Sequence, residues 1–225
     1  METEDRIDKI FELLDKWKNL PAYQLERRAD IFFALYLPEI IKQKFKLDDE
    51  VENLHIIPEF PVRTRGINKK TGKETFRSNR IDYAVVSKKI VYLVELKTDT
   101  GSINDPQKEY LRKTKTNKTN LIKDIVDIYH SENSDDKYKN LLSLLANMNW
   151  VEKIVNVEET SKKCKYKVIN DLNAYAIEIV YILPEEIIKE EDITEIDFNY
   201  IAEILNEKKD VLTVRFIESL KKWTA

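Results

Sequence analysis

Cysteine, glycine and histidine are scarce in this chain of 225 residues, which has one Cys, three Gly and two His. Because Cys164 is the single cysteine, the chain can form no internal disulfide and no cysteine-rich zinc site. Three glycines are too few for folds with many tight turns or for glycine-rich loops that cradle phosphates. His55 and His130 are too few for a metal centre built on histidine. These shortages exclude disulfide scaffolds, zinc fingers and glycine-loop nucleotide sites.

Long apolar runs are also missing. No stretch approaches the roughly 18 apolar residues that a membrane-spanning helix needs. The first residues, METEDRIDKIFELL, carry acids where a signal peptide has a basic segment. We therefore expect a cytoplasmic protein with no membrane contact. The composition, 42% hydrophobic and 35% charged, is too apolar for a disordered chain, and the length favours one globular domain over residues 1–225.

The formal net charge of −3 argues against a uniformly basic surface, but the charges are unevenly distributed. Residues 63–80 carry seven Lys or Arg against one acid, and residues 108–123 carry six against one. Residues 185–210 are strongly acidic instead. A basic middle beside an acidic region allows a local phosphate-binding surface. The alternative, equally open for each run taken alone, is a solvated charged surface.

Hydrophobic periodicity predicts a chain that mixes helices and strands. Apolar residues recur at spacings of three and four in segments that we expect to be helices. These helices span about residues 4–18, 22–45, 105–129, 136–149 and 200–208. Short runs rich in Val, Ile and Tyr predict strands. These strands span about residues 54–63, 81–86, 90–97 and 174–183. Residues 211–217 fit either a strand or the start of a helix.

Prolines refine this prediction. Pro38 is expected to kink or divide the second helix, because it removes one hydrogen bond of a helix interior. Pro58 and Pro61 cannot donate ladder hydrogen bonds, so the first strand is expected at the edge of a sheet. Asp105 and Pro106 are expected to supply the N-cap and the first residue of the third helix, which we expect to break near residues 117–120.

Two carboxylates and a lysine interrupt the strand pattern. On a strand, Glu95 and Lys97 project to one face. A hairpin that turns through residues 87–89 places Asp82 directly across from Glu95, with the Cβ atoms about 5 Å apart. Like charges this close repel each other unless a cation lies between them. The alternative is a salt bridge between Glu95 and Lys97 on an edge strand, with Asp82 as a strand-end residue.

A hard divalent cation suits this pair of carboxylates. Bound to Asp82, Glu95 and the backbone carbonyl of Leu96, Mg²⁺ would also hold a phosphodiester oxygen, and Mn²⁺ could substitute for it. Lys97 would orient or help deprotonate the attacking water, or stabilise the charge of the transition state. The carboxylates extend a run suited to a buried strand, where charge is rare unless it is paired or functional.

The order of the elements and these three residues resemble the PD-(D/E)xK nuclease superfamily, also called the restriction-endonuclease-like fold. The resemblance covers about residues 22–184, with Asp82 at the start of the second strand and Glu95-Leu96-Lys97 in the third; Ile81 stands where the name-giving Pro would be. It implies an α/β fold with an αβββαβ core, a central mixed sheet flanked by helices, and extra N- and C-terminal helices. Residues 185–225 would form an acidic C-terminal elaboration.

The resemblance also implies further site residues. In many members a Glu of the first core helix completes the metal shell; Glu26 is the best match and Glu39 the second choice. Gln107 and Tyr110 resemble a Gln–Tyr pair of RecB-like members and would bind the substrate, although they lie three residues apart where four is usual. Basic residues near the site would contact DNA phosphates without reading bases. These are Arg80, Lys108, Arg112 and Lys115.

Two functions follow from these observations. The first is a Mg²⁺-dependent deoxyribonuclease that leaves a 3′-hydroxyl and a 5′-phosphate. Duplex, single-stranded, branched and RNA substrates are all compatible with these residues, and one site per chain that cuts both strands would favour a homodimer. The second is a catalytically inactive descendant of the same fold. It would bind nucleic acid or protein, with the acidic C-terminal region as its contact surface.

Overall fold

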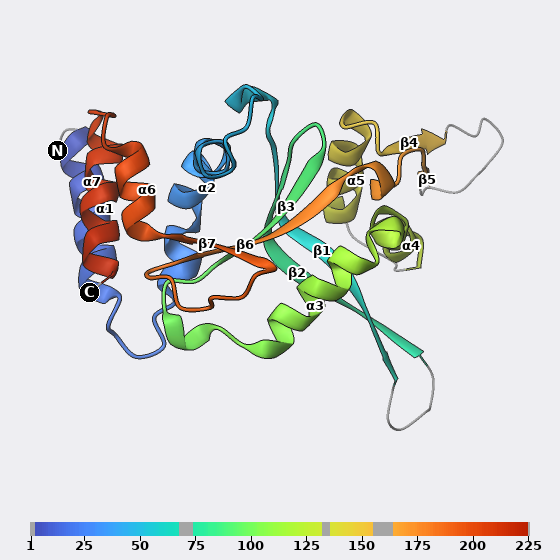
Figure 1. Cartoon of the computed structure of the whole chain (residues 1–225), viewed down its shortest axis with the longest axis horizontal. Coiled ribbons are helices and arrows are strands. Elements are labelled where there is room, and N and C mark those ends of the chain that lie inside the picture. The colour runs from blue at the N-terminus through green and yellow to red at the C-terminus, as the bar shows by residue number, and fades with distance from the viewer. Residues whose placement is uncertain (1–2, 68–73, 132–135, 155–163, 225) are drawn as a thin grey trace.

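Figure 1 shows the computed structural model of the chain, which describes residues 3–67, 74–131, 136–154 and 164–224. Its centre is a mixed sheet of five strands in the order β1-β2-β3-β6-β7. The first three strands are antiparallel neighbours: β1 (His55–Ile67), β2 (Glu74–Val86) and β3 (Ile90–Leu96). The last two, β6 (Ala176–Leu183) and β7 (Ile193–Asp197), continue the sheet parallel to β3.

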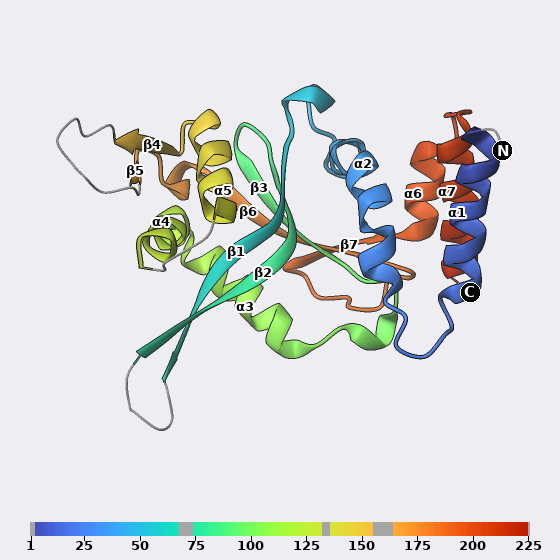
Figure 2. The ribbon, with the colours of Figure 1, turned by 180° about the vertical axis from the view of Figure 1, so that it is seen from behind.

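Helices cover both faces of this sheet, which confirms the predicted α/β class (Figures 1 and 2). One face packs against α2 (Leu25–Phe45), and α6 (Phe198–Leu205), α7 (Val211–Trp223) and α1 (Thr3–Trp17) extend the same core. The other face packs against α3 (Asp105–Thr116), α4 (Leu121–Ser131) and α5 (Asp136–Asn147). A small second sheet of β4 (Val151–Ile154) and β5 (Lys165–Val168) follows α5.

The alternation of side chains along β3 builds both cores. Tyr92 and Val94 contribute to the core beneath α2, whereas Val91 and Leu93 contribute to the core beneath α3 and α4. All four are 0% exposed. Burial of one such side chain stabilises a fold by about 1.5–3 kcal/mol. The apolar run that ends at Glu95 is therefore the middle of the sheet, with a layer of helices on each side.

Several sequence predictions are confirmed by this arrangement. β1 is an edge strand, as Pro58 and Pro61 predict. The chain breaks at residues 118–120 between α3 and α4, and the elements from α2 to β6 follow the order αβββαβ with α4, α5, β4 and β5 inserted. None of the described helices is long and apolar enough to cross a membrane. The polar residues 68–73 predict an exposed turn after the first strand, and they lie outside the described residues.

Other predictions need correction. Pro38 does not divide α2, which is continuous from Leu25 to Phe45 because its buried face holds it against the sheet. The N-cap of α3 is Asn104 and not Asp105: the Asn104 side chain accepts a hydrogen bond of 2.9 Å from the Gln107 N–H. Residues 211–217 open helix α7, and β4, β5 and β7 were not predicted, because they are short and mostly polar.

Candidate active site

The candidate site lies where β2 and β3 separate. The ladder between these strands has the register that the sequence predicts, and its last pair is Tyr83 with Val94. Asp82 and Glu95 come next in this register. At this point the Asp82 side chain replaces the backbone carbonyl as the hydrogen-bond acceptor between the strands. Its Oδ2 accepts a hydrogen bond of 2.8 Å from the Leu96 N–H. The end of the ladder thus brings Asp82 beside the segment that carries Glu95 and Lys97.

The ammonium group of Lys97 lies among three carboxylates. Its Nζ is 3.5 Å from Glu95, 3.9 Å from Asp82 and 3.7 Å from Glu26. It also donates a hydrogen bond of 3.0 Å to the carbonyl oxygen of Leu96. The Lys97 and Glu95 side chains are 7% and 1% exposed, whereas those of Asp82 and Glu26 are 31% and 33% exposed. The site therefore reaches solvent past Asp82 and Glu26.

Glu26 reaches this cluster from the first turn of α2. Leu25 precedes Glu26, and Ala29 lies one turn after it. Both are buried in the core and fix the orientation of this turn. Glu39 is 13 residues further along the same helix, about 20 Å away at the rise of an α-helix. Its carboxylate pairs with Lys208 at 3.0 Å instead. Of the two glutamates that the sequence proposes, the structure brings Glu26 into the site.

Gln107 and Tyr110 of α3 hold the buried carboxylate of Glu95. Gln107 Nε2 donates to Glu95 Oε2 at 2.6 Å, and the Tyr110 hydroxyl donates to Glu95 Oε1 at 2.5 Å. A spacing of three residues places both side chains on one face of a helix. The sequence assigns these residues to substrate binding. In the structure they contact the proposed metal ligand and fix its position.

Burial governs the protonation of the site. Loss of hydration, together with the smaller effect of the Asp82 charge and against the opposing effect of the Lys97 ammonium, raises the pKa of Glu95 to about 8. Burial also raises the pKa of Glu26, again opposed by Lys97. The protein without a divalent cation therefore carries a proton on Glu95 near neutral pH.

The residues present fit a hard divalent cation in their chemistry. Carboxylate and carbonyl oxygens are the ligands that Mg²⁺ prefers. Within the described parts of the chain, no group of three or more His, Cys, Asp or Glu side chains is arranged to hold a metal ion. The Lys97 ammonium lies among these same oxygens. Binding of a divalent cation would therefore require Lys97 to move away and Glu95 to lose its proton.

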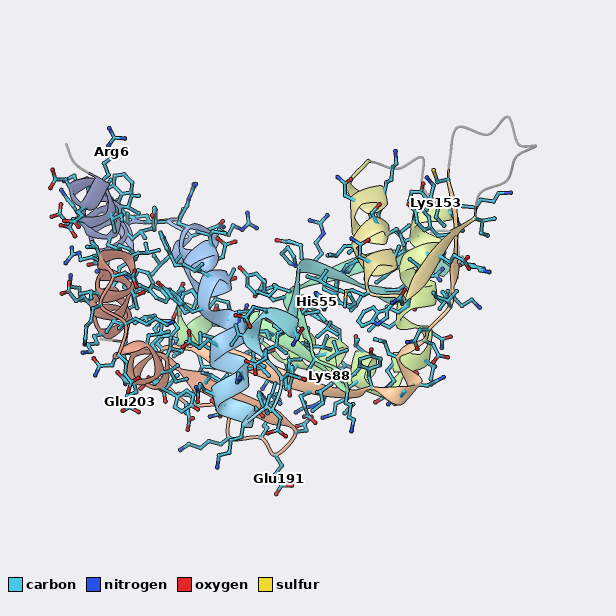
Figure 3. The ribbon with its side chains drawn as sticks, turned by 90° about the horizontal axis from the view of Figure 1, so that it is seen from above. Arg6, His55, Lys88, Lys153, Glu191 and Glu203 are labelled. Carbon is cyan, nitrogen blue, oxygen red and sulfur yellow. The ribbon has the colours of Figure 1, made fainter. Side chains whose placement is uncertain are left out.

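The basic residues of α3 are engaged by the acidic segment that joins β6 to β7. Lys108 lies 2.8 Å from Glu190, and Arg112 pairs with both Glu190 and Asp192. Lys115 pairs similarly with Glu178 of β6 at 3.3 Å. Glu191, between the two engaged acids, points outward (Figure 3). The predicted phosphate contacts Lys108 and Arg112 thus hold α3 against the β6–β7 segment.

Two hollows flank the carboxylate cluster. The one on the α2 side has a volume of about 770 Å³ and is lined by Tyr23, Gln24, Glu26 and Arg27 among others. The one on the α3 side has a volume of about 450 Å³. Its lining residues are Asn79, Arg80, Asn104, Pro106, Gln107 and Tyr110. Arg80, the remaining predicted phosphate contact, is 63% exposed at this second hollow and lies 3.5 Å from Glu59.

The chain has no significant match among family models, curated proteins or solved structures.

Proposed function

We propose that the chain is a Mg²⁺-dependent nuclease of the restriction-endonuclease-like fold that hydrolyses phosphodiester bonds in DNA. The observation that carries the proposal is the position of the buried Lys97 ammonium, within 3.9 Å of Asp82, Glu95 and Glu26. The αβββαβ order around this cluster supports it further.

Each side chain has a role in this proposal. Asp82, Glu95 and the Leu96 carbonyl oxygen hold Mg²⁺, which when bound supplies a Lewis acid for a phosphoryl oxygen and for the attacking water. Glu26 completes the shell directly or through water. Lys97, once released from the carboxylates, orients the water and stabilises the negative charge that develops on the phosphate. Gln107 and Tyr110 keep the Glu95 carboxylate in position.

The energetic cost of the cluster also favours a functional site. Removal of charged groups from water costs several kcal/mol per ion, and well-packed apolar side chains often give equal or greater stability. Glu95 and Lys97 are nevertheless buried next to the apolar middle of the sheet. Structural support alone does not require charges at these positions.

One observation favours the second candidate, a nuclease-fold protein that binds nucleic acid or protein without cleaving it. The Lys97 ammonium already neutralises part of the carboxylate charge, and the proton on Glu95 removes more. The cluster is thus electrostatically satisfied without a divalent cation. A binding module of this kind would keep its fold and its surface but would show no carboxylate-dependent Mn²⁺ site.

A cleavage assay tests the proposed function. Labelled linear, circular and single-stranded DNA are incubated with Mg²⁺ or Mn²⁺ and with the wild type, Asp82→Asn or Lys97→Ala. We expect metal-dependent cleavage by the wild type, and a loss of at least about 100-fold in each variant, because each removes a group that acts on the transition state. Absence of cleavage on every substrate would favour the binding module.

A further inference from the structure

Tyr181 of β6 lies directly beside Glu95 in the sheet. The two residues are paired in the parallel register of β3 and β6, and paired residues project their side chains to the same face. Tyr181 is 0% exposed. Its hydroxyl has no hydrogen-bond partner among the described residues. A buried hydroxyl without a partner destabilises a fold, and phenylalanine would fill the same volume without that penalty.

The charges of the candidate site affect the pKa of the Tyr181 hydroxyl. Burial raises the pKa of Tyr181, the negative charges of Glu95 and Asp82 raise it further, and the Arg112 guanidinium lowers it by a smaller amount. The group therefore stays protonated across the physiological pH range and remains a hydrogen-bond donor. Gln107, which also contacts the Glu95 carboxylate, has a second buried polar atom. Its Oε1 likewise lacks a hydrogen-bond partner within the described structure.

We propose that Tyr181 is a positioning residue for Glu95, whose hydroxyl donates a hydrogen bond to this carboxylate once a divalent cation has displaced Lys97 from it. The inference rests on the proposed function. In the present arrangement Tyr110 and Gln107 occupy one direction at each oxygen of Glu95. An ionised carboxylate offers about four lone-pair directions. It can therefore accept a further donor once Lys97 has moved away, and such partners fix the orientation of metal ligands.

Tyr92 provides a matched control on the same sheet. It is also 0% exposed, and its hydroxyl likewise lacks a partner in the described part of the chain. Tyr92 projects to the opposite face, beneath α2, where its ring lies 4.5 Å from that of Phe45. Tyr92→Phe and Tyr181→Phe are thus the same substitution at equally buried positions, and they differ in their distance from the site.

The test compares both variants with the wild type in two measurements made on the whole chain without nucleic acid. Mn²⁺ affinity is measured by calorimetry and by electron paramagnetic resonance, and the unfolding temperature by circular dichroism. We expect Tyr181→Phe to bind Mn²⁺ about tenfold more weakly, as for loss of a partner that orients a metal ligand, and Tyr92→Phe to bind it as the wild type does. Both variants should unfold at or above the wild-type temperature, because each loses an unpaired buried hydroxyl.

Each other outcome overturns the inference. Wild-type Mn²⁺ affinity in Tyr181→Phe would remove the role for the hydroxyl while the proposed function stands. Equal losses in both variants would assign the effect to packing. A loss of folding in Tyr181→Phe alone would assign the hydroxyl to stability. A wild type that binds no Mn²⁺ would refute the proposed function itself, and the inference with it.

Discussion

The Lys97 ammonium and the Glu95 carboxylate lie 3.5 Å apart, with the carboxylate 1% exposed and almost fully removed from water. The protonation of Glu95 depends on opposing effects that meet at this pair. Lys97 favours the ionised form of Glu95, whereas burial and Asp82 favour the protonated form. A divalent cation would replace both the proton and the ammonium, so metal binding, protonation and the position of Lys97 are expected to be coupled.

Glu26 and Glu39 give a first prediction, because they are the same residue type on one helix. Glu26→Ala should lower cleavage by at least about tenfold, since it removes a group that contributes to the metal shell. Glu39→Ala should leave cleavage unchanged, since Glu39 pairs with Lys208 away from the site. The rate of DNA cleavage at saturating Mg²⁺ measures both effects. Equal rates for the two variants would show that Glu26 does not contribute to the metal shell.

The raised pKa of Glu95 predicts how stability depends on pH in the absence of divalent cations. The folded pKa of about 8 exceeds the ordinary glutamate pKa of 4.5, so the contribution of Glu95 is fully present below pH 4.5 and is lost as the pH rises through 8. Within this window the contribution changes by at most about 1.4 kcal/mol per pH unit.

The control for this pH dependence is Glu95→Gln, which keeps the shape of the side chain and cannot ionise. Urea unfolding of both proteins between pH 5 and pH 9 gives the difference in the free energy of unfolding. The wild type should lose stability relative to the variant as the pH rises. A difference that does not change with pH would show that Glu95 is already ionised in the folded protein.

Arg112 gives a prediction that opposes its assignment from the sequence. Because its guanidinium pairs with Glu190 and Asp192, Arg112→Ala should leave the affinity for DNA and its salt dependence unchanged. Binding is measured in Ca²⁺, with Asp82→Asn as the background so that no DNA is cut, and with Arg80→Ala for comparison. A fall of about one in the slope of log affinity against log salt for Arg112→Ala would restore it as a phosphate contact.

The local part of the site could be predicted from the sequence. Asp82 and Glu95 belong to one hairpin, where the turn and the alternation of side chains fix which residues face each other. Glu26 was identified from the resemblance, which implies a glutamate on the first core helix. Gln107 and Tyr110 were also identified in that way, but their contact with Glu95 depends on how α3 crosses the sheet.

The distant part could not be predicted, because it depends on which strands pair across long stretches of chain. Tyr181 lies beside Glu95 through the parallel pairing of β3 with β6. A buried apolar run gives no signal of which strand it will join. The same applies to the acids of the β6–β7 segment, which return to α3 and neutralise Lys108 and Arg112. Their charges were visible in the sequence, but their partners were not.

The most direct test of the account is a Mn²⁺ titration of the wild type, Asp82→Asn and Lys97→Met at pH 7, followed by calorimetry in buffers of different ionisation enthalpy. The account predicts one Mn²⁺ site that is lost in Asp82→Asn, release of a proton on binding, and equal or tighter binding in Lys97→Met, which no longer places an ammonium among the ligands. No binding by the wild type, or binding that persists in Asp82→Asn, would contradict a metal-dependent nuclease site at these residues.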